Sequence, residues 1–148
     1  MTKQADDAVA MFLEGYNCAQ SVLATLGQQR GLDKDTAIKV AQAFGGGVAR
    51  TGSLCGALGG GLMALGLSCS ASSGADSAAK AKAYDIARAI MAEFARRHGS
   101  LLCRELTGCD LTTEEGTRRF KEIDAHHTIC TKLVADAVEI VQTAISKP

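Results

Sequence analysis

The sequence has no tryptophan, few other aromatic residues and a single proline. Its 148 residues include two Tyr and four Phe, while apolar residues make up 47% of the chain. This apolar fraction is enough for one substantial core, and the length is that of one ordinary domain. Because proline is scarce while Ala and Leu are common, the composition favours helices over an all-β fold.

An excess of charge of either sign is also missing. Sixteen Lys and Arg residues balance sixteen Asp and Glu residues, so nothing in the charge favours binding to nucleic acid or to an anionic membrane surface. The most apolar segment, residues 54–67, is too short to span a bilayer and contains several glycines. We therefore expect neither a nucleic-acid partner nor a membrane span.

The first residues show no basic stretch followed by an apolar one, so we do not expect a signal peptide. The expected location is the cytoplasm, where glutathione and thioredoxin keep thiols reduced. Six cysteines in such a chain are expected to pack in the core, to bind a metal or to be redox-active, rather than to form a disulfide framework.

Apolar residues recur at helical spacing along most of the chain, and no segment shows the alternation of a β-strand. We expect one all-α domain covering residues 1–148, a bundle of six to eight helices with a glycine-rich helix at its centre. That helix is expected to begin near residues 51–53 and to run to about Leu67. Its small residues Gly52, Gly56 and Gly60 recur every four positions and predict close packing against another helix.

Polar caps and glycines predict where the other helices begin and end. The expected starts are Asn17, in a capping-box pattern with Gln20, and then Asp33, Asp76, Ser100 and Thr113. The expected ends are Gly15, Gly27 with Gly31, residues 45–47, Gly99 and Gly108. The serine-rich residues 68–77 are expected to form an exposed loop.

Two further expectations concern individual helices. The third helix should carry Val40 and Phe44 on its apolar face, and stop at the glycines 45–47. The last helix should begin near Asp124 or Thr128 and reach Ser146.

Four of the six cysteines lie at or near an expected helix start; they are Cys18, Cys55, Cys103 and Cys130. Unpaired N–H groups and the positive end of the helix dipole favour a thiolate there over a thiol. Four thiolates brought together would need a metal ion or a cluster to neutralise their charge. A cysteine on an apolar stripe is also commonly a small buried hydrophobe, so both interpretations stay open for each residue.

The cysteine spacings exclude the common local motifs. No Cys-x-x-Cys pair occurs, which excludes a thioredoxin-type dithiol, a zinc ribbon and covalent c-type haem. Any metal site must therefore be assembled from distant segments. Cys69 lies in the serine-rich stretch and Cys109 lies close to Cys103, and we place both outside the expected site.

Two histidines precede Cys130 by four and three residues. If the segment is helical, either His126 or His127 could face the same site, but two adjacent side chains cannot both point the same way. At least one of them is therefore expected to be a surface residue.

The glycine-rich residues 45–53, GGGVARTGS, have some likeness to a phosphate-binding loop. They lack the Lys of that motif, and no strand is expected before them. We expect instead a turn that binds an anion or donates N–H groups to cluster sulfurs.

Four blocks of the sequence together resemble a known family. They are residues 15–20 (GYNCAQ), residues 52–60 (GSLCGALGG), Gly99 and Ser100 with Cys103, and finally Cys130. In this order they resemble the C-GCAxxG-C-C family, to which a redox role is assigned. The resemblance implies that its four signature cysteines are Cys18, Cys55, Cys103 and Cys130. It also suggests an iron–sulfur cluster as the cofactor.

The leading hypothesis is a small protein that binds an iron–sulfur cluster through these four cysteines, for electron transfer or redox sensing with a partner protein. One alternative is a metal-free thiol–disulfide protein, and another is a module that binds Zn²⁺ or Cu(I) without redox chemistry. No acid–base pair or nucleophile–histidine arrangement indicates a hydrolase, so no enzyme activity is assigned. Two copies could meet across the glycine-rich helix, and the sequence leaves this open.

Overall fold

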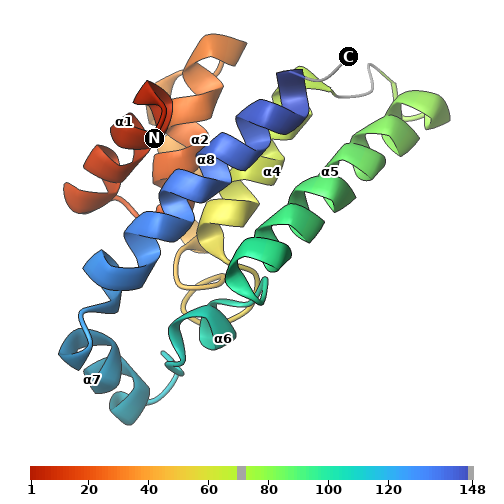
Figure 1. The fold of residues 1–148 in the computed structure, drawn as a ribbon. Helices are drawn as coiled ribbons and strands as arrows, with labels where there is room; N and C mark the ends of the chain where they lie inside the picture. The colour runs from red at the N-terminus through yellow and green to blue at the C-terminus, as the bar shows by residue number, and fades with distance from the viewer. Residues whose placement is uncertain (70–72, 147–148) are drawn as a thin grey trace.

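Three helices form the centre of the fold: α2 (Cys18–Gly27), α4 (Gly56–Ser68) and α8 (Thr131–Ser146). The computed structural model describes residues 1–69 and 73–146. Helix α1 (Lys3–Leu13) packs on α2 and α8, and the long α5 (Ser77–His98) packs on α8 and α4, as Figure 1 shows. The predicted all-α bundle is confirmed, since the described residues contain helices, turns and one isolated β-bridge but no strand.

The glycine-rich helix α4 is buried on nearly all sides, as predicted for the central helix. Residues 56–61 are all buried, and α4 has its most extensive contact with α2. A Cβ atom on Gly60 would lie 2.6 Å from the carbonyl oxygen of Ala19, so the two backbones meet where only glycine fits. The predicted close helix packing is therefore confirmed for Gly56 and Gly60, whereas Gly52 lies in the loop before α4 with positive φ. None of the described helices is long and apolar enough to cross a membrane.

Most predicted caps are also confirmed. Asn17 and Gln20 form a complete capping box at the start of α2. Asp33, Asp76 and Thr113 accept hydrogen bonds from backbone N–H groups at the starts of α3 (Lys34–Val40), α5 and α7 (Glu114–Glu122). Gly31, Gly99 and Gly108 end their helices in the left-handed conformation.

The predicted start of α4 is wrong. This helix begins at Gly56, because residues 46–50 turn in the left-handed sense and delay its start. The predicted cap Ser100 does not cap α6 (Cys103–Thr107), whose N-cap is Leu102. The Ser100 hydroxyl instead accepts a hydrogen bond from the Leu102 N–H.

The predicted third helix is too long. The observed helix α3 ends at Val40, and a separate 3₁₀ turn (Gln42–Phe44) follows. The side chain of Val40 is 55% exposed, so it does not lie on a buried apolar face. The last helical segment begins just after Asp124, as predicted: its first turn is a π turn (His126–Cys130), which continues directly into α8. Of the expected serine-rich loop, residues 70–72 lie outside the described residues; Ser68 ends α4 and Asp76 caps α5.

The small helices α6 and α7 lie at one end of the bundle, together with the loop that precedes α4 (Figure 1). This end is opposite the one where α8 finishes. The starts of α2, α4 and α8 therefore meet two short helices and a glycine-rich loop in one place.

Candidate functional site

Four cysteines from four segments line one cavity at this end of the bundle; they are Cys18, Cys55, Cys103 and Cys130. The cavity has a volume of about 480 Å³. Cys55 is buried, the other three are partly buried, and all four are free thiols. The structure thus brings together the four cysteines that the sequence selected, although 112 residues separate the first from the last.

All four cysteines lie at or next to helix starts, as predicted. Cys18 and Cys103 are the first residues of α2 and α6, and Cys55 is the residue before α4. Cys130 is the residue before α8 and ends the π turn that leads into that helix. π turns are rare, and they occur frequently at functional sites.

A short backbone pairing holds Cys55 beside Cys103. The Cys55 N–H donates to the Leu101 carbonyl, and the Cys103 N–H donates to the Ser53 carbonyl, both at 2.8 Å. Between them, Leu54 and Leu102 form an antiparallel β-bridge. Both hydrogen bonds are made by the backbone, so the relative position of the two cysteines does not depend on side-chain caps.

The loop before α4 has an uncommon backbone conformation. Five consecutive residues have positive φ, from Gly46 (66°) and Gly47 (69°) through Val48 (66°) and Ala49 (52°) to Arg50 (62°). For residues other than glycine this left-handed conformation costs roughly 1–2 kcal/mol each. Hydrogen bonds close the turn, including Ser53 N–H to the Gly47 carbonyl at 2.8 Å. Such strain persists where the surrounding structure enforces it, commonly at functional sites.

This loop packs directly on two of the cysteines. Gly46 is within backbone hydrogen-bonding reach of the Cys18 sulfur, and a Cβ atom on Gly47 would lie 2.6 Å from the Cβ of Cys103. The expected glycine-rich turn is therefore present beside Cys18, while its donation of N–H groups to cluster sulfurs stays a prediction. The glycines are needed here for close approach as well as for positive φ.

Burial dominates the electrostatics of the four thiols. It raises the pKa of Cys55 to about 12 and that of Cys103 to about 11, and it also raises the pKa values of Cys18 and Cys130. The charge of Cys18 is the next cause of the increase at each of the other three. The predicted preference for thiolates is therefore wrong for the metal-free chain, because desolvation outweighs the helix-start N–H groups.

The remaining cysteines differ from these four. Neither Cys69 nor Cys109 lines the cavity. Cys109 is 1% exposed and its thiol donates to the Thr107 carbonyl at 3.4 Å. It is near enough to Cys103 and Cys130 for its charge to raise their pKa values, although it does not line the cavity.

The two histidines also separate, as their adjacency predicted. His126 lines the cavity and stacks on Phe12, with 4.1 Å between the ring centroids. Burial lowers its pKa, which favours the neutral imidazole. His127 is exposed and lies 2.9 Å from the carboxylate of Asp124.

The sequence interpretation missed several other residues that line the cavity. They include Tyr16, Leu111, Phe120 and Lys121. Tyr16 lies in the GYNCAQ block, but the sequence interpretation assigned it no role of its own. No motif or spacing marks the other three: α7 carries Phe120 and Lys121, and Leu111 lies shortly before it. Within residues 1–69 and 73–146, no group of three or more His, Cys, Asp or Glu side chains is placed to hold a metal ion.

Comparison with known proteins gives one match. The model of a family described as "Putative redox-active protein (C_GCAxxG_C_C)" matches residues 16–144 of the chain. No curated protein and no solved structure matches the chain significantly. The matched region contains all four cavity cysteines and nearly the whole fold.

Proposed function

The chain belongs to the C_GCAxxG_C_C family of redox-active proteins, and from this premise we propose that Cys18, Cys55, Cys103 and Cys130 bind an iron–sulfur cluster. The bound cluster would supply one-electron redox chemistry. The protein would use it to transfer electrons to a partner protein or to sense redox state. The proposal keeps the cytoplasmic location expected from the sequence, where thiols stay reduced.

The observation that carries this proposal is the convergence of four thiols from four distant segments on one cavity. Cys55 belongs to the hydrophobic core, and Cys18 and Cys130 pack against it, so the support comes from their common cavity rather than from their burial alone. The thiols are near enough for the charge of Cys18 to raise the pKa of each of the other three. Cysteine thiolates are the usual ligands of iron–sulfur clusters.

The raised pKa values are consistent with a metal centre. A buried thiol keeps its proton unless a positive centre compensates the charge of the thiolate, and metal binding releases that proton. Backbone N–H groups, including that of Gly46 near Cys18, would then donate to sulfur and tune the centre.

A cluster is preferred to one metal ion because the family is described as redox-active. Four cysteines can bind the iron atoms of a cluster, which supplies redox chemistry. They can also bind Zn²⁺, but this ion has no redox chemistry of its own.

The metal-free thiol–disulfide alternative is less well supported. The attacking group in thiol–disulfide exchange is a thiolate, and burial keeps Cys55 and Cys103 protonated far above neutral pH. No observation favours Zn²⁺ or Cu(I) over a cluster, and both are outcomes that the experiment distinguishes.

The test is anaerobic purification followed by measurement of iron, acid-labile sulfide, zinc and copper per chain, with the visible spectrum. We expect iron and sulfide in equal amounts and a brown protein. Zinc or copper without sulfide would overturn the cluster proposal and support the alternative of a module that binds Zn²⁺ or Cu(I). A metal-free protein that undergoes a reversible two-electron thiol titration would support the thiol–disulfide alternative instead.

Serine variants then test the site. Each of Cys18→Ser, Cys55→Ser, Cys103→Ser and Cys130→Ser should lose most of the iron, because a serine hydroxyl is a poor soft-metal ligand. Cys69→Ser and Cys109→Ser are the matched controls and should keep it, since neither residue lines the cavity. Equal iron content in all six variants would overturn the assignment.

A further inference from the structure

The cavity that the four cysteines line has a volume of about 480 Å³. This volume falls in the range of pockets that hold small organic molecules, about 300–1,000 Å³. Three of the six Phe and Tyr side chains of the chain line it: Phe12, Tyr16 and Phe120. A chain so poor in aromatic residues thus has half of them at the cavity that contains its four cysteines.

Part of this aromatic wall is not used for folding. Leu111 and Phe120 are partly buried, yet neither belongs to the hydrophobic core nor packs against it. Both come from α7 or the turn before it, at the edge of the bundle (Figure 1). Their apolar surfaces line the cavity, which is where a bound molecule would cover them.

The charge of the lining has one sign. Arg50 and Lys121 line the cavity, and no Asp or Glu does, although the whole chain has equal numbers of acidic and basic residues. Among the described residues, neither side chain has a hydrogen-bond or ion-pair partner. Arg50 is presented by the strained left-handed turn, and Lys121 by α7. Two unpaired cations therefore face an apolar, aromatic space.

From this combination we propose that the cavity binds a small organic anion with a flat apolar body. Arg50 and Lys121 would hold the anionic group, a carboxylate, sulfonate or phosphate. The aromatic wall of Phe12 and Phe120 would hold the body. The proposal rests on the proposed function only in that the molecule would lie over the redox site.

The first experiment uses two probes that share a naphthalene body and differ in the charge of their polar group: 2-naphthoate and the uncharged 2-naphthalenemethanol. Because the chain has no tryptophan, naphthalene fluorescence can be followed without tryptophan emission. Metal-free, reduced protein is titrated with each probe at low ionic strength. We expect 2-naphthoate to bind about tenfold more tightly, the effect of one or two charge-assisted hydrogen bonds.

Variants locate the two parts of the site. The double variant Arg50→Gln with Lys121→Gln should weaken 2-naphthoate about tenfold and leave 2-naphthalenemethanol unchanged. Phe120→Ala should weaken both probes. Arg118→Gln is the matched control, since Arg118 is an exposed cation on α7 that does not line the cavity. Helix content by circular dichroism shows that each variant is folded.

Three results would overturn the proposal: no binding of 2-naphthoate in the millimolar range, equal affinity for both probes, or an equal effect of Arg118→Gln. Equal affinity would mean that the two cations only balance charge at the cysteines. Because the titration needs no metal, its result is independent of the iron and sulfide analysis. A protein that binds 2-naphthoate without ever holding a cluster would overturn the proposed function alone, and the reverse result would overturn this inference alone.

Discussion

The sulfur of Cys18 occupies the space that a Cβ atom on Gly56 would need. The first residues of α2 and α4 are therefore in direct contact, with no room for a side chain between them. The carbonyl oxygen of Phe44 closes the same space from another direction, at 2.6 Å from that Cβ position. The same contact therefore packs α4 against α2 and fixes the position of Cys18 in the cavity.

This contact predicts that Gly56→Ala destabilises the protein. Gly56 is buried, so the added methyl group must displace Cys18 or the backbone, at a cost of about 1–3 kcal/mol. Gly56→Leu should cost more. Urea unfolding of the metal-free protein measures the effect.

Two other glycines of the same helix provide controls. A Cβ on Gly59 would meet only Leu54, at 3.9 Å, and one on Gly66 would meet nothing within 4 Å. Alanine at either position should be neutral or stabilise the helix by up to about 1 kcal/mol. If Gly56→Ala is as stable as these two controls, the contact with Cys18 has no structural importance.

The left-handed turn predicts opposite effects for two neighbouring substitutions. Gly47→Ala places a Cβ against Cys103 at a positive φ, and should cost about 1–3 kcal/mol. Ala49→Gly removes strain at a φ of 52°, and should stabilise by up to about 1 kcal/mol. Thermal melts compare the two variants with the wild type. A loss of stability in Ala49→Gly would show that the turn is not strained there.

Alkaline pH should destabilise the metal-free, reduced protein. The cavity thiols have an ordinary pKa of 9.0, which burial raises to about 12 for Cys55 and to about 11 for Cys103. Above pH 9 the unfolded chain has therefore lost protons that the folded chain still binds. The free energy of unfolding should be constant below that pH and fall as the pH rises toward the folded-state pKa values.

Urea midpoints between neutral pH and about pH 10 measure this slope. The variant with serine in place of all four cavity cysteines should have a shallower slope, because its hydroxyls do not ionise in this interval. Equal slopes in the two proteins would assign the alkaline loss of stability to other groups.

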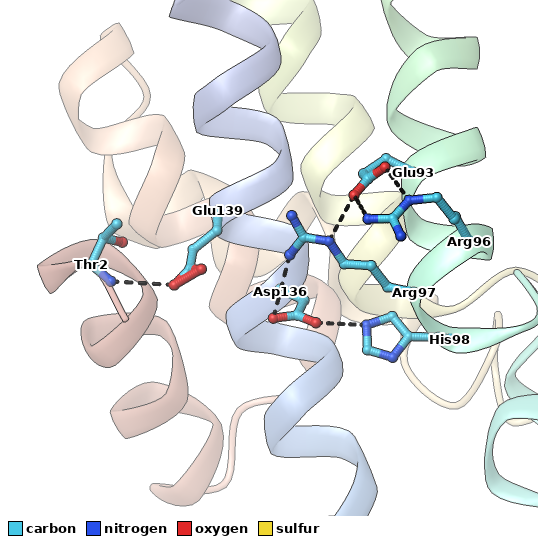
Figure 2. Close-up of polar contacts among 7 residues, drawn as sticks. All are labelled: Thr2, Glu93, Arg96, Arg97, His98, Asp136 and Glu139. Carbon is cyan, nitrogen blue, oxygen red and sulfur yellow. Dashed lines mark hydrogen bonds and ion pairs between the residues drawn. The ribbon is translucent and has the colours of Figure 1, made fainter.

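A fourth prediction concerns the charged contact between α5 and α8. Figure 2 shows Asp136 of α8 beside Arg97 and His98 at the end of α5, at 3.8 Å from the Arg97 guanidinium and 2.9 Å from His98 Nε2. Glu93 holds Arg97 from the other side at 2.9 Å. Asp136→Asn should lower stability by about 1 kcal/mol, since these groups are partly exposed. Iron content should not change, because Asp136 does not line the cavity; a loss of iron would link this contact to the site.

The sequence by itself determined the helical class, most of the caps and the identity of the four cysteines. These features are local or compositional. The Asn17 capping box, the Asp76 cap and the glycine ends are set within a few residues by backbone hydrogen bonding, and they agree with the structure. Buried glycines such as Gly60 could be recognised from the sequence, because small residues repeated on one helix face allow another backbone to approach closely.

Only the tertiary structure decided where α4 begins, how the thiols ionise and what faces them. The left-handed turn and the pairing of Ser53 with Cys103 delay α4 until Gly56, and that pairing joins residues 50 positions apart in the sequence. Helix starts taken alone favour thiolates, whereas burial by the whole fold raises the pKa of Cys55 to about 12. The aromatic and cationic wall depends on where α7 lies, which no local pattern encodes. Desolvation and long-range contact are properties of the assembled chain, and they shaped this cavity.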